Sequence, residues 1–500
     1  MVKPSGVQRE SDGVVVPVIA ARNAVGGKGP GFDHAGRAGK REGMTGDGWS
    51  NNPDRPRSVD ARSGAGSSGG KVRELQRKLW AAAKQSEGRR FHALYDRIHR
   101  GDVLWEAWER VRMNRGAAGV DRVTLAVVED YGVDRMLREL SRDLQQGRYR
   151  PAPVRRVEIP KPDGRKRSLG IPTVRDRVAQ QAAKLVLEPI FEADFLSCSY
   201  GFRPKRSATD ALERIRVSFP RGTQFVFEAD IRDFFGSIDH ERLMGLVEQR
   251  VSDRRVLKLL RSWLRVGVLT SEGGVERAVA GTPQGGVISP LLANVFLHAF
   301  DKAWAARGTG ELVRYADDFV VLCTTRSQAE EAHRRAEALL GDLGLVLHPE
   351  KTCVVDLREG REGFDFLGCH LHARMSGRMW EQYGKVRYYL HRWPSARAMK
   401  NARARVKALT SRSRVGTDLE DTIGALNQFL RGWGGYFRTG NAATKFCQLD
   451  RYVVWRLKRL LIKRRGRNLR AGQASRWTPA WFHDQGLYQL SGTICYPKAA

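Results

Sequence analysis

The sequence is poor in cysteine, has no long apolar run and carries far fewer acidic than basic residues. Its six cysteines lie far apart and form no CxxC pair, which argues against both a zinc site and a disulfide framework. No apolar stretch approaches the roughly 18–20 residues that cross a membrane. These absences predict a soluble, non-secreted protein of a reducing cytoplasm, with no membrane partner.

The shortage of acidic charge is large. Lysine and arginine together number 87 against 55 aspartate and glutamate residues, so the formal net charge is +32 at pH 7. A chain tolerates self-repulsion of this size for a purpose, and a polyanion such as nucleic acid is the obvious partner. Hydrophobic residues still make up 41% of the 500 residues, which suits about two to four folded domains.

Residues 1–70 lack nearly everything that builds a core. They contain 15 of the 52 glycines and only two aromatic residues, Phe32 and Trp49. Such a composition cannot bury enough apolar surface to offset the entropy of ordering. It therefore predicts a disordered, glycine-rich N-terminal tail over residues 1–70.

Folded structure is expected from Lys71 onward. Residues 72–80 have the apolar spacing of an amphipathic helix, and a second helix is expected over residues 103–112. A β-hairpin with basic residues at its tip is predicted over residues 154–171. Helix caps are expected at four positions: Thr173, Ser207, Asp239 and Ser289.

Three aspartates stand out because each is expected at the end of a strand. Residues 225–231 form an apolar strand that contains Asp230, and Asp317 and Asp318 lie near the turn of a predicted hairpin. If one sheet brings them together, three carboxylates can hold two divalent ions about 3.5–4 Å apart. Hard oxygen ligands suit Mg²⁺, which takes substrate phosphates as further ligands. This pattern indicates metal-dependent phosphoryl transfer.

The order of elements around these aspartates predicts a fold. A strand, a helix, a hairpin, a helix and further strand segments at residues 345–352 and 364–368 follow one another between residues 225 and 370. This is the order of a split β-α-β, ferredoxin-like layer.

The chain from about Ala396 is predicted to be helical and very basic. An apolar stripe between residues 452 and 461 runs beside a dense group of lysines and arginines. A charge run of this kind is often a solvated helix face. Its density, and the glycine and aromatic residues at positions 432–437, favour nucleic-acid contact instead.

Several of these blocks together resemble a known family, the reverse transcriptases, and most closely the reverse transcriptase and maturase proteins of bacterial group II introns. Residues 227–231 resemble the first catalytic block of that family, residues 282–290 its loop on the dNTP side, and residues 315–318 its metal block. The resemblance extends over residues 71–500. It is to the type that lacks an endonuclease, because the paired cysteines and histidines of a zinc-supported nuclease domain are missing, so second-strand cleavage is not expected.

The resemblance implies an α+β fold of the right-hand polymerase type, followed by an all-α maturase thumb and a short basic C-terminal tail. It places an N-terminal extension and the fingers at residues 71–224 and a ferredoxin-like palm with the catalytic aspartates at residues 225–375. The maturase thumb follows at residues 376–470 and a DNA-binding tail at residues 471–500.

The resemblance also assigns roles in catalysis. The catalytic residues would be Asp230, Asp317, Asp318 and Lys351, with Lys351 as a general acid near the departing pyrophosphate. Two Mg²⁺ ions would be held by Asp230, Ile231, Asp317 and Asp318.

Further assignments by resemblance concern the substrates. The incoming nucleotide would be contacted by Lys161, Arg167, Phe235 and Gln284, with Phe235 screening out a ribose 2′-OH. The primer end would be gripped by Phe366, Leu367 and Gly368. RNA would be bound by Arg456, Arg459, Lys463 and Arg464.

The implied function is that of an RNA-directed DNA polymerase that also binds its own intron RNA and assists splicing and retrohoming. Its partners would be intron RNA, an RNA template, a DNA primer, target DNA and dNTPs, in the bacterial cytoplasm near the nucleoid. Two alternatives stay open on the sequence alone. One is a free-standing relative in defence or repair, and the other is a non-catalytic RNA-binding maturase.

Overall fold

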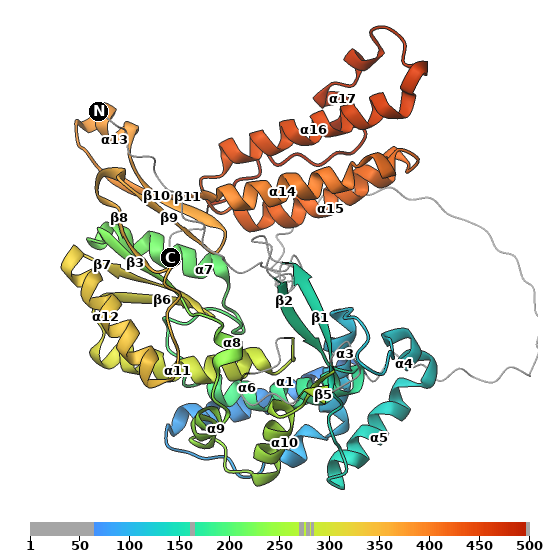
Figure 1. Cartoon of the computed structure of the whole chain (residues 1–500), viewed down its shortest axis with the longest axis vertical. Coiled ribbons are helices and arrows are strands. Elements are labelled where there is room, and N and C mark those ends of the chain that lie inside the picture. Colours follow the sequence, from blue (N-terminus) through green and yellow to red (C-terminus); the bar gives the residue numbers. More distant parts are fainter. Residues whose placement is uncertain (1–64, 161–165, 270–274, 277–280, 282–284, 497–500) are drawn as a thin grey trace, which may run out of the picture.

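The computed structural model describes residues 65–160, 166–269, 275–276, 281 and 285–496, and the chain is shown in Figure 1. The predicted tail falls mostly outside this range, except that its end is helical. Helix α1 begins at Ala65 and not at Lys71 as expected. The second expected helix is present as α3, which is one or two residues longer at each end than predicted.

The N-terminal half is built mainly of helices packed around α6. Helices α1 and α3 both pack against α6, and α5 packs against α3. Thr173 caps α6 by accepting a hydrogen bond from the backbone N–H of Asp176, as the sequence predicts. Helices of this part are α1 (Ala65–Gln85), α2 (Tyr95–Ile98), α3 (Gly101–Met113), α4 (Leu125–Tyr131), α5 (Val133–Gln145) and α6 (Val174–Glu192), whereas α7 (Ala208–Ser218) packs against strand β6 (Glu311–Tyr315) of the central sheet.

A four-stranded sheet in the order β2-β1-β4-β5 stands beside these helices. The predicted hairpin is present as β1 (Val154–Pro160) and β2 (Lys166–Ile171), and β4 (Val268–Leu269) adds to it in parallel with β1. The fourth strand is β5 (Val275–Glu276). Residues 268–269 and 275–276 therefore join the N-terminal sheet, although the sequence assigned them to the domain at 225–375. Only pairing between distant strands decides this.

The central sheet has the order β6-β7-β3-β8 and is antiparallel throughout. This is the arrangement that a split β-α-β order produces, with α12 packed against β3, β7 and β8. Its strands and helices are β3 (Phe225–Asp230), α8 (Phe234–Ser237), α9 (His240–Glu248), α10 (Arg254–Leu264), α11 (Ser289–Arg307), β6 (Glu311–Tyr315), β7 (Asp318–Cys323), α12 (Arg326–Asp342) and β8 (Cys353–Asp356).

Two local predictions in this region need correction. The strand expected at residues 345–352 is absent, because Leu347 makes only an isolated bridge to Ile231 and Pro349 cannot donate to a ladder. The fourth strand is β8 instead. Ser289 is the first residue of α11 and not its cap, a position that Ile288 takes, whereas Ser207 and Asp239 cap their helices as predicted.

A third sheet, in the order β11-β10-β9, joins the central sheet to the C-terminal helices. Its strands are β9 (Gly363–Phe366), β10 (Cys369–Met375) and β11 (Tyr388–Pro394), and the short helix α13 (Gly377–Tyr383) connects the last two. The strand predicted at 364–368 is thus β9, in a sheet separate from the aspartates. The boundary predicted at residue 376 falls inside the β10–β11 hairpin.

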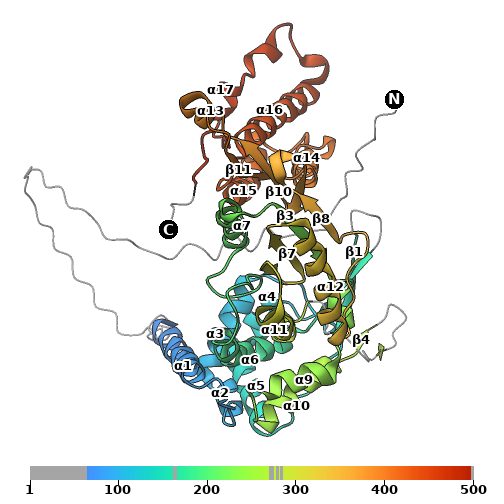
Figure 2. The same ribbon diagram turned by 90° about the vertical axis from the view of Figure 1, so that its left-hand side faces the viewer.

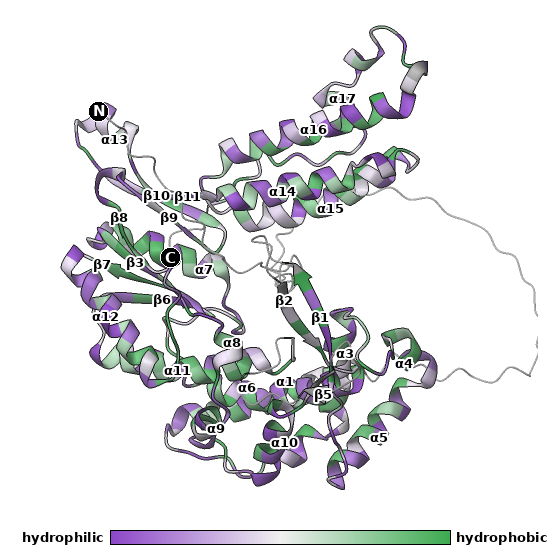
Figure 3. Cartoon of the chain, viewed as in Figure 1, coloured by the Kyte–Doolittle hydropathy of each residue, from purple (hydrophilic) through white to green (hydrophobic). Residues whose placement is uncertain are grey.

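The C-terminal part is all helical up to its last residues. Helices α14 (Ala396–Leu409), α15 (Leu419–Phe437) and α16 (Ala443–Arg465) pack together, and α17 (Pro479–Asp484) packs against α16. Val453, Leu457 and Leu461 lie on the buried face of α16, which confirms the apolar stripe. Figure 3 shows hydrophobic and hydrophilic residues alternating along α5, α12 and α16, and Figure 2 shows the C-terminal helices at the opposite end of the molecule from α9 and α10.

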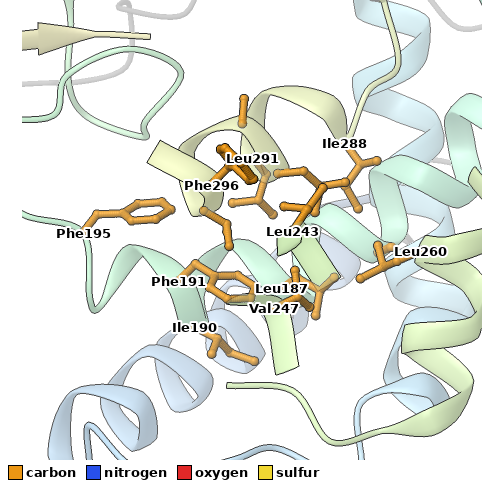
Figure 4. Close-up of a cluster of buried hydrophobic side chains, with 14 of the residues drawn as sticks. Leu187, Ile190, Phe191, Phe195, Leu243, Val247, Leu260, Ile288, Leu291 and Phe296 are labelled. Atoms are coloured by element: carbon orange, nitrogen blue, oxygen red, sulfur yellow. The ribbon is translucent and has the colours of Figure 1, made fainter. Parts of the chain in front are cut away.

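The buried side chains form two clusters, one around the N-terminal helices and one under the third sheet and the C-terminal helices. In the first, α11 packs between α6 and α9, where Leu187, Leu243 and Phe296 meet, as Figure 4 shows. Packing of this density fixes the position of α11, and with it the central sheet. Among the described residues, no helix is long and apolar enough to cross a membrane.

Candidate active site

Two of the three predicted aspartates face each other across the central sheet. Asp230 is the last residue of β3 and Asp318 the first of β7, and they are direct partners in the antiparallel register. The strand segments that carry them are almost completely buried, for example at Phe227 and Val320. The two carboxylates thus lie side by side at one end of the neighbouring strands β3 and β7, with about 5 Å between their Cα atoms.

The turn that carries Asp317 is held from beneath by a buried arginine. Arg314 donates to both carboxylate oxygens of Asp301, at 2.7 and 2.5 Å, and both side chains are completely buried. The same guanidinium donates to the backbone carbonyl of Ala316 at 2.9 Å and to the Ser199 hydroxyl at 2.8 Å. Ala316 has φ +58°, a strained value for alanine, so the turn depends on these contacts.

A second segment packs against the same turn from the other side. The backbone N–H of Tyr200 donates to the Arg314 carbonyl at 2.8 Å, and Arg314 in turn donates to the Cys198 carbonyl. A Cβ added at Gly201 would stand 2.4 Å from the backbone nitrogen of Ala316. Only glycine allows this approach, so residues 198–201 form a rigid support for the aspartates.

Lys351 lies at the same edge of the sheet. Its ammonium is 2.8 Å from the Asp230 carboxylate, and its side chain is only 11% exposed. The chain returns to this point because the backbone N–H of His348 donates to the Asp230 carbonyl and that of Lys351 to the His348 carbonyl. The lysine was predicted near the departing pyrophosphate, and its ion pair with Asp230 puts it beside the opposed carboxylates.

The acidic groups at this edge repel one another. Burial raises the pKa of Asp318 well above its usual value, and the charges of Asp317 and Asp230 raise it further. Glu228 lies on the same face of β3, two residues before Asp230, and burial together with Asp365 and Asp230 raises its pKa to about 8. Such a site favours a cation, because positive charge would relieve both the desolvation and the repulsion.

The residues fit a divalent ion only in part. Over the described ranges, no three His, Cys, Asp or Glu side chains meet closely enough to hold a metal ion by themselves. Asp230 and Asp318 supply a pair of carboxylates, which is the number that Mg²⁺ commonly takes from a protein alongside substrate phosphates. The side chain of Ile231 is 2% exposed, so only its main chain can reach a ligand.

Phe235 follows the same strand. Asp233 turns the chain with φ +42°, Phe234 enters the core, and Phe235 stays half-buried with its ring edge-on to Phe234 at 5.3 Å between centroids. Gly281 packs directly on this turn, since its N–H donates to the Ile238 carbonyl and a Cβ there would lie 2.8 Å from the Phe235 carbonyl oxygen.

The other expected nucleotide contacts are only partly described. Lys161 and Gln284 lie outside the described residues. Arg167 is in β2, paired with Ile159, and only its backbone is described. Gly285 rests on β2, where a Cβ would lie 2.5 Å from the Gly170 carbonyl oxygen.

The segment expected to grip a primer is a buried joint. The side chains of Phe366 and Leu367 are 4% and 1% exposed, so neither side chain is available for the predicted primer contact. Leu367 and Gly368 both have positive φ, and the Tyr436 hydroxyl donates to the Leu367 carbonyl at 2.7 Å. Contact from this segment is therefore limited to its main chain. The segment ties the third sheet to α15.

The four basic residues predicted to bind RNA differ in exposure, since Arg456 and Arg464 are half-buried and Arg459 and Lys463 are exposed. Arg456 donates to the hydroxyl and carbonyl of Thr410, and Arg464 donates to the carbonyls of Val415 and Thr417. These two arginines tie α16 to the end of α14 and the loop after it, and RNA binding by them stays a prediction. Arg459 and Lys463 are exposed, and Arg459 lies 4.8 Å from the centroid of the Trp455 ring.

The residues that support the turn from beneath, Arg314, Asp301 and Ser199, were not predicted from the sequence. A signal was present, since an arginine inside an apolar strand is unusual and almost never fully buried unless paired. The partner could not be identified from the sequence, because Asp301 lies on a helix with no local tie to the strand.

An antiparallel sheet with opposed aspartates, flanked by helices and a basic helical domain, defines the polymerase type of α+β fold. Residues 159–371 match the family of reverse transcriptases, described as RNA-dependent DNA polymerases, and residues 399–478 match the maturase-specific domain of group II introns. The chain belongs to the group II intron type of reverse transcriptase and maturase, as the sequence predicted.

Two relatives illustrate the similarity. Protein YkfC of Escherichia coli K12 is 34% identical over 361 residues, which cover 63% of this chain and 91% of YkfC. The group II intron-encoded protein LtrA of Lactococcus lactis is 37% identical over 216 residues, covering 42% of this chain and 35% of LtrA. A solved structure, the partial Cas6-RT-Cas1--Cas2 complex, matches 50% of this chain and 42% of that chain at 22% identity, with a TM-score of 0.32.

Membership in this family has two general consequences. The chain is a polymerase that depends on a divalent metal ion, generally Mg²⁺, and its partners are RNA and other nucleic acids.

Proposed function

We propose that this chain copies RNA into DNA with two Mg²⁺ ions at the edge of the central sheet, and that it binds its intron RNA to assist splicing and retrohoming. The observation that carries the proposal is the register of β3 and β7, which opposes Asp230 and Asp318. Nucleotide transfer needs charge neutralisation and positioning more than a protein nucleophile, and a pair of opposed carboxylates supplies the anchor for it.

The proposed domains follow the fold with revised limits. Residues 65–224 and 254–288 would form the N-terminal extension and fingers, because β4 and β5 pair with the hairpin β1–β2. Residues 225–253 and 289–366 would form the palm. Strands β10 and β11 with helices α14–α16 would form the thumb, from about residue 369 to 470, and residues 471–500 the DNA-binding tail.

In this proposal each side chain has one task. Metal ions held at the edge of the central sheet would supply charge that lowers the pKa of the primer 3′-hydroxyl and stabilises the leaving phosphate. Asp230, Asp317 and Asp318 hold the metal ions, and Arg314 keeps the turn of the two adjacent aspartates in place. Lys351 directs its ammonium toward the phosphates and gives a proton to the departing pyrophosphate. Its present bond to Asp230 keeps it within reach of that position.

The remaining assignments concern the nucleotide and the primer. Phe235 occupies the place of a ribose 2′-OH, while Lys161, Arg167 and Gln284 contact the incoming dNTP. Gly368 and the main chain of the joint at residues 366–368 hold the primer end. Arg459 and Lys463 contact RNA phosphates. Template RNA, primer, target DNA and dNTPs are thus the proposed partners.

Primer extension on an RNA template tests the proposal. Asp318→Asn keeps the size of the side chain but removes its charge, and we expect DNA synthesis to fall by about a thousandfold or more, since metal stabilisation of the transition state is worth several kcal/mol. The matched control is Glu350→Gln, which removes an exposed carboxylate one residue before Lys351. Equal synthesis by Asp318→Asn and the wild-type protein would refute the proposed metal site.

A non-catalytic maturase is the weaker alternative. The buried Arg314–Asp301 pair and Gly201 hold the turn of Asp317 and Asp318 in one conformation, which favours a catalytic use of that turn. The RNA affinity of Asp318→Asn separates the two functions, since we expect it to match that of the wild-type protein.

A further inference from the structure

The β10–β11 hairpin extends well beyond the strand that supports it. Strand β9 pairs with β10 only from Cys369 to His372, whereas the β10–β11 ladder continues to the pair of Met375 and Tyr388. Helix α13 closes its far end. Figure 1 shows this end standing apart from β1 and β2 and from helices α14–α16. Residues 369–394 are called the distal hairpin below.

One face of the distal hairpin is built of aromatic, imidazole and basic side chains. Side chains alternate along β10, so Leu371 and Ala373 enter the core while His370, His372 and Arg374 lie on the opposite face. Trp393, the register partner of His370, joins them there. Its ring centroid is 5.2 Å from that of His370, and the Arg374 guanidinium lies 4.7 Å from it.

The same character continues at the tip. Met375, Trp380, Tyr383 and Val386 are all large hydrophobic residues, and they are 47%, 53%, 64% and 59% exposed. Residues 374–387 contain four basic residues and one acidic residue. Four exposed hydrophobic side chains within twelve residues, two of them aromatic, exceed the scattered exposure that is normal on a surface.

The chemistry of this face matches unpaired nucleotides. Aromatic rings at the surface stack on bases, and neighbouring cations bind the phosphates between them, which is the common design of single-strand binding surfaces. Base-paired nucleotides hide their ring faces and cannot use such a site. A second copy of the chain is disfavoured as the partner, because its net charge of +32 repels an equally charged surface.

We propose that the distal hairpin is a binding site for single-stranded nucleic acid, separate from the proposed polymerase site at Asp230 and Asp318. Trp380 and Tyr383 stack on bases, and Arg374 with its neighbours contacts the phosphates. The inference rests on the proposed function for its source of unpaired RNA. The site would hold a looped or displaced strand while the central sheet is engaged with another part of the nucleic acid.

Binding of a short RNA to the full chain tests the site. The probe is a labelled single-stranded RNA of roughly 12 nucleotides, within the range of single-strand sites. It is added to protein whose proposed polymerase site is already saturated by an excess of unlabelled RNA–DNA hybrid. We expect the affinity of the double variant Trp380→Ala with Tyr383→Ala for the probe to fall by at least about tenfold, because the loss of one stacked base commonly has an effect of that size.

Two control variants isolate stacking. Trp380→Phe with Tyr383→Phe keeps both rings, and its affinity should stay within about twofold of the wild-type value, since stacking tolerates any aromatic face. Trp80→Ala removes a tryptophan of similar exposure, 46%, from α1 and should leave the affinity unchanged. Equal affinity of the alanine double variant and the wild-type protein would overturn the proposal.

Crosslinking locates the contact. The same probe with 4-thiouridine should crosslink to peptides that contain residues 374–387, and crosslinks confined to the rest of the chain would refute the site. A single-stranded DNA of the same sequence tells whether the sugar matters, and either result supports a site for unpaired bases. A blunt RNA duplex that binds as well as the single strand would contradict it.

Two further outcomes would assign the face to another partner. Concentration-dependent dimerisation that is abolished in the alanine double variant would make it a self-association surface. Binding to anionic lipid vesicles that is abolished in the same variant would make it a membrane surface. Primer extension on a short hybrid should be unchanged in this variant and abolished in Asp318→Asn, so failure of the hairpin proposal is distinct from failure of the proposed polymerase.

Discussion

The guanidinium of Arg314 and the carboxylate of Asp301 form a completely buried, two-pronged ion pair directly beneath the turn that carries Asp317 and Asp318. The same guanidinium reaches the Ala316 carbonyl, at the residue with the strained backbone. The pair therefore connects the long helix α11 to the position of the predicted catalytic aspartates.

We predict that replacing one partner of this ion pair destabilises the protein more than replacing both partners by apolar residues. Asp301→Asn leaves a buried guanidinium without its counter-charge, and the free energy of unfolding should fall by about 3–5 kcal/mol. The double replacement Arg314→Met with Asp301→Leu removes both charges and should cost less than either single change. Urea denaturation of Arg314→Met, Asp301→Leu and the double variant measures these losses, and additive losses would contradict the prediction. Primer extension should fall in the double variant too, since the turn loses its support.

Phe235→Ala should admit ribonucleotides. The ring of Phe235 is half-buried after the short turn that follows Asp230, and its removal would open space for a 2′-OH. The preference for dNTP over rNTP should drop by about 10- to 200-fold, the range of discrimination by a single steric contact. Incorporation of each nucleotide type on one template measures this ratio. Phe235→Tyr keeps the ring and should keep the preference, and an unchanged ratio in Phe235→Ala would place the gate elsewhere.

The basic residues of α16 should divide into two groups. Arg459→Ala with Lys463→Ala removes two exposed cations, and RNA affinity should fall while the salt dependence flattens by about one unit for each phosphate that the variant no longer neutralises. The free energy of unfolding should hardly change.

Arg456→Ala with Arg464→Ala is the matched comparison. It removes the hydrogen bonds that tie α16 to Thr410 and Thr417, so stability should fall by about 1–3 kcal/mol per arginine. RNA titrations at several salt concentrations and urea denaturation separate the two effects. The reverse pattern would show that Arg456 and Arg464 are the RNA contacts.

His298 should make stability depend on mildly acidic pH. Burial lowers the pKa of this histidine from 6.5 to about 4, against a smaller opposing effect of Asp301. Between these values the unfolded chain binds a proton that the folded chain does not. The contribution of neutral His298 to the free energy of unfolding is therefore fully present above pH 6.5 and is lost as the pH falls toward 4. From pH 7 to pH 5 this group alone should remove about 2 kcal/mol.

The contribution of His298 is measured by comparing the pH dependence of stability in the wild-type protein and in a variant without the histidine. Urea denaturation of the wild-type protein and of His298→Gln at both pH values should show a smaller loss of stability in the variant, because other titrating groups are common to the two proteins. Parallel pH dependence in both would show that His298 is not buried in its neutral form.

The sequence by itself determined the local elements of this protein. The strand ending at Asp230, the hairpin around Asp317 and Asp318, and the caps at Thr173, Ser207 and Asp239 were predicted correctly, because residues close together in the chain decide them. The family was recognised from the same short blocks.

Tertiary structure alone decided which of these elements meet. The opposition of Asp230 and Asp318, the ion pair of Lys351 with Asp230 and the burial of Phe366 all depend on contacts between segments that are distant in the chain, 121 residues in the case of Lys351 and Asp230. Arg456 and Arg459 lie three residues apart on one basic helix, yet Arg456 is half-buried and donates to Thr410, whereas Arg459 is exposed to solvent. Periodicity describes the faces of a helix, but what packs against each face is set by the rest of the chain.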